Sequence, residues 1–413
     1  MMVLGPRLGR RQAGGRACPQ PAASHQVSTT VPAAGKLDIV DTRTSIDLFA
    51  GAGGATAGLF LAGCDVRLAV ERDKDAAATY SANFPGVQLL PEAIETYTPS
   101  YILEKAGLQP GTLDILSACP PCQGFSTLGK CDPDDDRNDY VQTVEALVEN
   151  LRPRALILEN VPGLDHDPRS SRLKASLHSI GYGVGSWVLD ATEFCVPQRR
   201  RRFVLIAVSG LTNDEIADPR SSYRCADWPA HPHTVRNVLH ALGPPTAGES
   251  LHAARNLPPP ILRRVRAVPH DGGSRKDLPE SLQLECHKRL SQRGAASVYG
   301  RMAWDEPAPT ITTRCTTPAC GRFLHPEQDR PITLREAAAF QTFPPTFCWK
   351  GGVMHIGRQI GNAVPVRLAY LLTLHTIRLI RLAEGRSVSS QQLGPDPSPR
   401  RSPKTATLAI PSV

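Results

Sequence analysis

The chain has 413 residues, enough for roughly two to three domains of about 150 residues each, so it can bury a sizeable core. With 41% hydrophobic and 21% charged residues, its composition excludes a wholly disordered chain or a disulfide-stapled miniprotein. The net charge of +8 is a modest bias towards polyanionic partners such as nucleic acid.

The two ends of the chain differ from its middle. Residues 1–43 are rich in Gly, Pro, Ala, Ser and Arg and show no apolar period, which predicts a disordered leader. Residues 384–413 have a similar composition and predict a disordered tail. No stretch approaches the roughly 18 uninterrupted apolar residues of a membrane span, and the start lacks the apolar run of a secretory signal. We therefore expect a cytoplasmic protein without a membrane partner.

Between these ends, short apolar runs alternate with helical patterns. The runs read as strands buried on both faces, at residues 45–50, 67–70, 114–118, 155–158 and 203–208. Apolar residues at helical spacing lie between them, as in residues 141–151. This alternation predicts an α/β fold, with a doubly wound and mostly parallel sheet covered by helices.

The pattern changes near residue 212. From there to about residue 300, segments rich in Pro, His and Arg replace the regular periods, which predicts a second, smaller and loop-rich lobe. Helical periodicity returns at residues 334–340 and 366–382. We expect a first lobe over 44–211, the second over 212–355, and a helix over 356–383 that completes the first lobe.

A glycine-rich segment follows the first predicted strand. Residues 49–55 read Phe-Ala-Gly-Ala-Gly-Gly-Ala, and such a turn lets backbone N–H groups approach a ligand at the start of a helix. Glu71 ends the next strand about 20 residues later, where an acid can accept hydrogen bonds from the two hydroxyls of a ribose. Together they predict a site for a nucleoside-bearing cofactor. Taken alone, the glycine-rich segment is also explained by a tight turn, and Glu71 is also explained by a solvent-exposed surface acid.

The strand at 114–118 leads into a segment with two cysteines, Cys119-Pro120-Pro121-Cys122, at the sheet edge where open α/β folds bind ligands. A thiolate is a potent carbon nucleophile once a pocket favours it, so Cys122 is the candidate nucleophile. A redox pair or half of a zinc site is the alternative. No second such pair completes four zinc ligands, and the glycine loop is foreign to a thioredoxin-like fold, so we expect no metal. The odd number of cysteines, 11, favours reduced thiols.

Glu159 follows the next buried run and so reaches the same edge of the sheet. A carboxyl group in such a pocket can have its pKa raised enough to act as a general acid near pH 7. A solvated loop acid is the alternative.

These segments stand in the order found in cytosine-C5 DNA methyltransferases of the bacterial restriction-modification type, which the sequence strongly resembles. The matching segments are residues 47–54, 121–126, 159–161, 198–203, 335–344 and 361–365. The resemblance spans roughly residues 44–383 and implies a Rossmann-like methyltransferase fold whose second lobe recognises the target.

The resemblance also implies a mechanism. In this family a cysteine adds to C6 of a cytosine flipped out of duplex DNA, and C5 then takes the methyl group of S-adenosylmethionine. Cys122 matches that nucleophile, Glu159 matches the acid at the N3 and amino edge of the base, and Arg200 matches the arginine that holds O2.

The remaining site residues carried over from the resemblance fall into two groups. The cofactor-binding residues are Phe49, Gly51, Gly53, Glu71, Pro121 and Asn362, and the DNA-binding residues are Gln123, Ser126, Arg202 and Thr310. The family commonly has an Asp that reads the adenine amino group in the segment before the fourth strand. Residues 87–96 contain no Asp, and Glu92 is the candidate substitute.

The expected partner is double-stranded DNA, and flipping a base costs a few kcal/mol that contacts from residues 199–202 and 212–300 would offset. A restriction endonuclease acting on the same site would be a second partner. We expect a monomer associated with the nucleoid. An RNA (tRNA) cytosine-5 methyltransferase of the same family and a catalytically silent DNA-binding relative are the alternatives.

Overall fold

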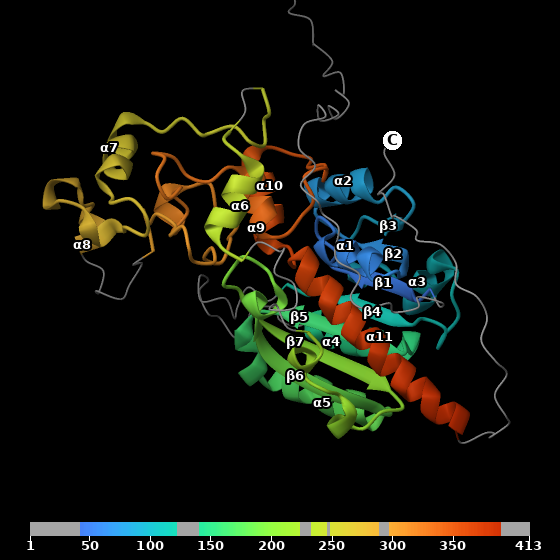
Figure 1. The fold of residues 1–413 in the computed structure, drawn as a ribbon. Helices are drawn as coiled ribbons and strands as arrows, with labels where there is room; N and C mark the ends of the chain where they lie inside the picture. The colour runs from blue at the N-terminus through green and yellow to red at the C-terminus, as the bar shows by residue number, and fades with distance from the viewer. Residues whose placement is uncertain (1–41, 122–139, 224–232, 246–247, 289–296, 390–413) are drawn as a thin grey trace, which may run out of the picture.

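The computed structural model describes residues 42–121, 140–223, 233–245, 248–288 and 297–389. A seven-stranded sheet with the order β3-β2-β1-β4-β5-β7-β6 forms its centre (Figure 1). The strands are β1 Thr44–Leu48, β2 Asp65–Val70, β3 Gln88–Leu90, β4 Ile115–Ala118, β5 Ala155–Asn160, β6 Tyr182–Asp190 and β7 Arg201–Ser209. The pairs among β1 to β5 are parallel, whereas β7 runs antiparallel to β5 and β6. The doubly wound, mostly parallel sheet predicted from the sequence is confirmed.

The order of the strands creates a switch point between β1 and β4. The chain builds outward from β1 through β2 to β3, and then returns to place β4 and β5 on the other side of β1. Open sheets of this kind bind ligands at the carboxyl ends of the strands beside such a reversal. The glycine loop after β1 and the two-cysteine segment after β4 both begin at this point.

Helices cover both faces of the sheet. They are α1 Gly54–Leu61, α2 Lys74–Asn83, α3 Pro99–Ala106, α4 Tyr140–Leu151, α5 Pro168–Ser179 and α11 Val366–Ser389. Alternate strand residues point to opposite faces: Ile115 and Ile157 pack with residues of α1 and α11, whereas Leu116 and Leu158 pack with residues of α3, α4 and α5. The strands therefore read as continuous apolar runs because neither face meets water.

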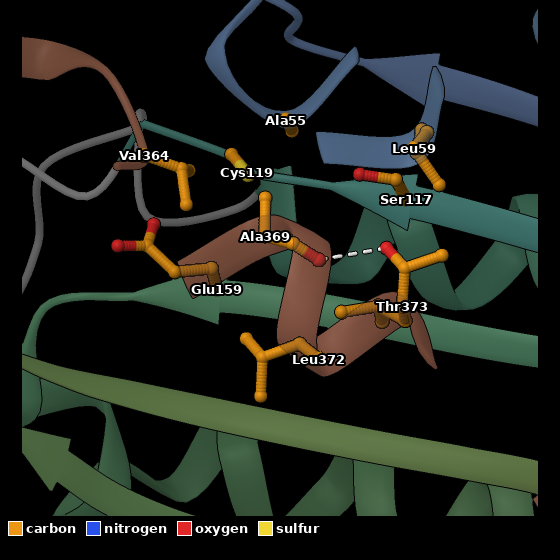
Figure 2. Close-up of a pocket in the computed structure, with 10 residues that line it drawn as sticks. Ala55, Leu59, Ser117, Cys119, Glu159, Val364, Ala369, Leu372 and Thr373 are labelled. Atoms are coloured by element: carbon orange, nitrogen blue, oxygen red, sulfur yellow. Dashed lines mark hydrogen bonds between the residues drawn. The ribbon is translucent and has the colours of Figure 1, made fainter. Parts of the chain in front are cut away.

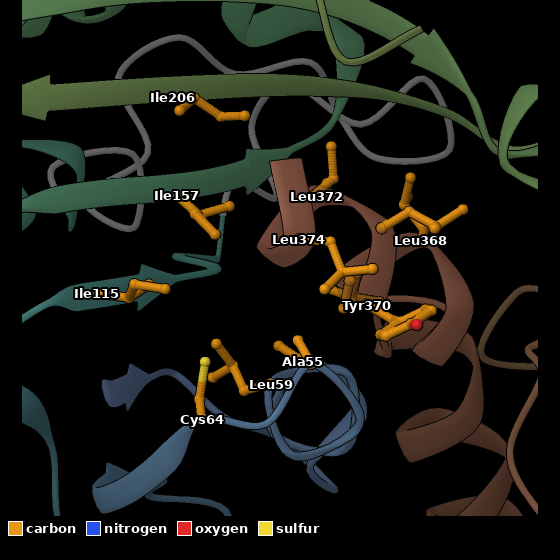
Figure 3. Close-up of a cluster of buried hydrophobic side chains, with 14 of the residues drawn as sticks. Ala55, Leu59, Cys64, Ile115, Ile157, Ile206, Leu368, Tyr370, Leu372 and Leu374 are labelled. Carbon is orange, nitrogen blue, oxygen red and sulfur yellow. The ribbon is translucent and has the colours of Figure 1, made fainter. Parts of the chain in front are cut away.

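The last long helix, α11, lies directly on α1, which stands about 300 residues earlier in the sequence (Figure 3). Leu368 and Leu372 of α11 point into the same apolar layer as Ala55 and Leu59 of α1. A Cβ atom on Gly58 would lie 2.5 Å from Cβ of Ala369, so the two helices approach more closely than any larger residue permits. This contact closes one face of the sheet.

The second lobe contains helices and loops. Its helices are α6 Val235–Leu242, α7 Pro259–Ala267, α8 Glu285–Lys288, α9 Leu334–Phe340 and α10 Val353–Asn362. Within the described part of residues 210–365, the chain forms isolated β-bridges but no strand. The prediction of a loop-rich second region is confirmed, and α7 and α8 lie farthest from the sheet in Figure 1.

A buried arginine organises this lobe in place of a sheet. The guanidinium of Arg301 is fully buried and donates to the backbone carbonyls of Val265, Val268, His325 and Gln328 and to the carboxylate of Asp329. Loops carry carbonyl groups that no ladder satisfies, and an arginine with five fixed N–H donors can satisfy several at once.

Three features differ from the sequence-based predictions. Strands β3 and β6 were not predicted, because β3 has three residues and β6 contains Gly183 and Gly185, which break the apolar run. The helix expected over 356–383 is two helices separated by residues 363–365, and the boundary expected at residue 355 falls inside α10. Ile356 and Ile360 of α10 pack with the second lobe and not with the sheet.

The stretch Val353–Gly385, which comprises α10, the connection after it and most of α11, is long and apolar enough to cross a membrane. However, 89% of its most apolar window is buried inside the protein, so its apolar residues face the core.

We expect the substitution Gly58→Ala to lower the thermal unfolding midpoint. The added Cβ would meet Cβ of Ala369 at 2.5 Å and the backbone nitrogen of Tyr370 at 2.6 Å, and such overpacking costs about 1–3 kcal/mol, which outweighs the better helix propensity of alanine. Gly385→Ala in α11 is the matched control, since nothing lies within 4 Å of its added Cβ. Equal midpoints for both variants would show that the close approach of the two helices is unimportant for stability.

Candidate active site

The loop after β1 turns sharply through residues with left-handed backbone angles. Phe49, Gly51 and Gly53 have φ values of 57°, 57° and 96°. A Cβ atom on Gly54 would lie 2.3 Å from the carbonyl oxygen of Val364, so the loop rests against the connection between α10 and α11. Glycine permits both the turn and this approach.

Glu71 at the end of β2 lies against this loop. Its Oε2 accepts a hydrogen bond from the backbone N–H of Gly51 at 2.8 Å, and its Oε1 accepts one from Asp73 at 2.6 Å. Burial raises the pKa of Glu71, while the hydrogen bonds from Asp73 and Gly51 act in the opposite direction. The two parts of the predicted cofactor site, the glycine loop and the acid, are therefore in contact.

Aromatic rings border the same site. The ring of Phe49 meets that of Tyr140 edge to face with 5.3 Å between centroids, and Arg72 donates to the Tyr140 hydroxyl at 2.9 Å. Burial and a hydrogen bond to Glu95 both raise the pKa of Tyr140. Because Glu95 hydrogen-bonds to the Tyr140 hydroxyl, the acid beside this ring pair is Glu95 and not the expected candidate Glu92.

The ends of β4 and β5 form the neighbouring part of the site. The side-chain amide of Asn160 donates to the carbonyl of Pro120 at 2.9 Å and so holds the segment that leads into Pro121, which is half-buried. Glu159, one residue earlier, is 8% exposed. The predicted residues Cys122, Gln123 and Ser126 lie outside the described residues.

A small cavity lies beneath this edge, between β4, β5, α1 and α11. Ser117 of β4 and Cys119, the residue that follows β4, line it, and Glu159 of β5 lines it across from them (Figure 2). Burial, with further contributions from nearby Glu159 and Asp47, raises the pKa of the Cys119 thiol well above its usual range. Cys119 is therefore a protonated thiol near neutral pH and a poor nucleophile.

Arg202 is the arginine that reaches Glu159. β7 runs antiparallel to β5 with Val204 opposite Glu159, which places Arg202 just beyond the end of β5. Its Nε atom lies 2.9 Å from Oε1 of Glu159, and both side chains are mostly buried. Oε1 has no hydrogen-bond partner with suitable geometry among the described residues, so a buried acceptor is left at the edge of the site.

Arg200 occupies a different position. Its guanidinium is fully buried and donates to the backbone carbonyls of Ile311, Gly361 and Ala363. Burial lowers the pKa of Arg200 well below its usual range. The sequence-based role of Arg200 as the arginine that holds the base does not fit this geometry. Arg202, which the sequence assigns to DNA binding, is the arginine of this run that contacts Glu159.

Two further predicted residues lie at the joint between the lobes. Thr310 donates its hydroxyl hydrogen bond to the carbonyl of Arg199 at 2.7 Å, and Asn362 is exposed at the end of α10. Sequence reasoning missed Gln198, which is fully buried, accepts from the Ile311 N–H and donates to Oε1 of Gln341. Gln198 directly precedes four arginines, so the composition of this segment points to charge. The contact with the second lobe is nevertheless made by the buried side-chain amide of Gln198.

No group of three or more His, Cys, Asp or Glu side chains suited to a metal ion occurs among the described residues. Six described cysteines are free thiols, including Cys315 and Cys320. Cys195 is disulfide-bonded and is an exception to the expectation of reduced thiols, which the six free cysteines follow. Residue spacing alone does not reveal which sulfurs the fold brings together.

Comparison with known proteins gives a consistent result. A family model for C-5 cytosine-specific DNA methylases matches residues 43–377. The Type II methylase M.HgiDII of Herpetosiphon aurantiacus is 37% identical over 342 residues, which cover 79% of this chain and 93% of the relative. The Type II methyltransferase M.AgeI of Thalassovita gelatinovora is 30% identical over 417 residues, which cover 78% of this chain and 96% of the relative.

Solved structures share the fold. A putative DNA modification methyltransferase encoded within an Escherichia coli prophage superposes with a TM-score of 0.60 at 22% identity, covering 82% of this chain and all of that one. The Dnmt2 methyltransferase of S. pombe gives a TM-score of 0.58 at 17% identity, covering 82% of this chain and 99% of that one. The resemblance seen in the sequence is thereby confirmed: the chain belongs to the family of C-5 cytosine-specific DNA methylases.

Proposed function

We propose that this protein transfers a methyl group from S-adenosylmethionine to C5 of a cytosine flipped out of double-stranded DNA, through a covalent bond between Cys122 and C6. The observation that carries the proposal is the buried contact between Glu159 and Arg202, 2.9 Å apart. It lies at the carboxyl end of β5 and the amino end of β7, beside the cavity that Ala55 of α1 also lines. Labelled methyl transfer to DNA, followed by bisulfite sequencing, is the direct test.

The glycine loop and Glu71 suit the cofactor. The left-handed turn at Gly51 and Gly53 keeps the loop free of bulky side chains, and the carboxylate of Glu71 is fixed beside it by two backbone N–H groups. Phe49 presents an aromatic ring at the same point. When bound there, S-adenosylmethionine supplies a methyl group activated by its positively charged sulfur.

The residues of β4, β5 and β7 suit the base. The thiolate of Cys122 adds to C6, and the electron pair of the 5,6 double bond moves to C5, which becomes the nucleophile. Glu159 stabilises the negative charge on the ring by hydrogen bonding at N3 and the amino group, and Arg202 holds Glu159 and the O2 edge. After methylation, C5 loses its proton, the 5,6 double bond re-forms, and Cys122 leaves as the thiolate.

The second lobe is the proposed reader of the DNA sequence, and Gln123, Ser126 and Thr310 are proposed as further DNA-binding residues. Loops are suited to this task because base edges are read by a few positioned side chains. Two Type II relatives at 30% and 37% identity support a place in a restriction-modification system, with an endonuclease that cuts the same site. We expect a cytoplasmic monomer. Methylation of RNA in preference to duplex DNA would favour the alternative function.

Cys122→Ser should abolish methyl transfer, because an alcohol is not ionised near pH 7 as a thiol can be. Cys119→Ser is the matched control three residues away, and it should retain most activity because the raised pKa of the Cys119 thiol keeps it protonated near neutral pH. Both are measured with labelled cofactor and saturating DNA. DNA with 5-fluorocytosine at the target should trap the parent protein covalently, since fluorine does not leave as a proton. Turnover of Cys122→Ser near that of the parent would exclude the mechanism.

Arg202→Ala and Arg200→Ala should fail in different ways. Loss of Arg202 should lower kcat about 10²–10³-fold, as for the loss of one preorganised donor, with a small change in the unfolding midpoint. Loss of Arg200 should lower the midpoint, because three buried carbonyl oxygens lose their donor. Thermal unfolding and single-turnover kinetics on both variants separate these effects. The reverse pattern would return Arg200 to the base pocket.

Glu71→Ala should weaken cofactor binding by about 1–3 kcal/mol, the range for losing hydrogen bonds to a charged group. Isothermal titration calorimetry with S-adenosylmethionine measures the change. Glu92→Ala is the control, since Glu92 is exposed and should leave the affinity unaltered. Unchanged affinity in Glu71→Ala would remove this residue from the cofactor site.

A further inference from the structure

A buried carboxylate that the proposed chemistry does not use lies between the two halves of the site. Asp47, in β1, is 0% exposed. Its Oδ1 accepts a hydrogen bond from the Ser117 hydroxyl at 2.9 Å, and its Oδ2 accepts one from the Thr56 hydroxyl at 2.7 Å. The Thr56 oxygen also lies 3.0 Å from the Tyr80 hydroxyl. All these groups are buried.

Placing a carboxylate here has an energetic cost. Burial raises the pKa of Asp47 to about 6, against the hydrogen bonds from Thr56 and Ser117, and nearby Glu71 adds to the rise. At neutral pH the group is therefore mostly ionised inside the sheet. An apolar residue of similar size would avoid this cost, so packing alone does not account for an acid at this position.

The hydrogen bonds of Asp47 join segments that serve different ligands in the proposed function. Thr56 lies in the first turn of α1, directly after the glycine loop. Ser117 lies in β4, where it pairs in register with Asp47, and it precedes Cys119 by two residues. Figure 2 shows Ser117 on β4 and Cys119 just after the end of this strand, both bordering the cavity, with Glu159 across from them.

We propose that Asp47 is a positioning residue for methyl transfer, which fixes the cofactor loop relative to the strand that leads to the base pocket. This inference rests on the proposed function. Methyl transfer requires the methyl carbon and C5 to be aligned at close distance, so it depends on the relative position of two separately bound molecules. Attack of the thiolate on C6 requires the base alone. Loss of Asp47 should therefore slow methyl transfer far more than attack of the thiolate on C6.

The two processes can be measured separately. Attack on C6 makes C5 exchange its hydrogen with water, so release of tritium from [5-³H]cytosine DNA, without cofactor, reports the thiolate step. Methyl transfer is followed in a single turnover with both ligands saturating. In Asp47→Ala, the ratio of methyl transfer to exchange should fall about 100-fold, the size expected for a misplacement of roughly 1 Å. Asp47→Asn keeps one acceptor oxygen and should recover part of the ratio.

Matched variants control for stability. Thr373 lines the same cavity, and its hydroxyl donates to the Ala369 carbonyl within α11 (Figure 2). Thr373→Val should leave the ratio unchanged even where the unfolding midpoint falls. If Asp47→Ala does not fold, Ser117→Ala and Thr56→Val remove the two hydrogen bonds one at a time, and each should lower the ratio.

The outcomes distinguish the two proposals. Parent protein that neither exchanges tritium nor transfers methyl groups would overturn the proposed function itself. The second outcome concerns an active parent protein and folded variants of Asp47, or of Ser117 and Thr56. If exchange and methyl transfer change by the same factor in these variants, or do not change, only the positioning role of Asp47 is overturned.

Discussion

The site depends on the return of α11 to the sheet. This helix fills one face of the sheet together with α1, and its close contact at Gly58 brings the preceding residues 361–365 against the glycine loop, where Val364 meets Gly54. At the other end of the helix, Arg43 donates to both carboxylate oxygens of Glu384 at 2.7 Å. A segment from the end of the sequence therefore supports a loop that begins near residue 49.

The strands that carry the site were predictable, and the partners of individual side chains were not. β1, β4 and β5 are buried on both faces, so their apolar runs are visible in the sequence, and the residues after them necessarily share one edge. Arg200 and Arg202 stand in a run of identical residues. Only the pairing of β7 with β5 shows which one reaches Glu159. In the same way, the sequence places Asp47 in a strand predicted to be buried on both faces, but it does not show the contacts of Asp47 with Ser117 and Thr56.

Net charge overstates the positive charge available on the surface. Several arginines are buried and bound to backbone carbonyls or acids, including Arg43, Arg200, Arg301 and Arg330. Within the run at 199–202, Arg199 pairs with Glu306 and Arg202 pairs with Glu159. Of the run that the sequence marks as a phosphate-binding segment, Arg200 and Arg202 are therefore engaged within the protein, whereas Arg199 and Arg201 are exposed. Charge counted from composition is weak evidence for a DNA surface, whereas the positions of the charges are informative.

The contacts between the two lobes would link recognition of the DNA sequence to methyl transfer. Gln198 and Arg200 bind Ile311 of the second lobe, and Arg200 also binds the carbonyls of residues 361 and 363, so three segments meet next to β7. These hydrogen bonds are buried, so the contact between the two lobes is rigid. If the second lobe reads DNA, changes in its outer helices α7 and α8 can alter the sequence recognised while the pocket keeps its geometry. Changes near Ile311 would disturb both sequence recognition and methyl transfer, because both then depend on the same contact between the lobes.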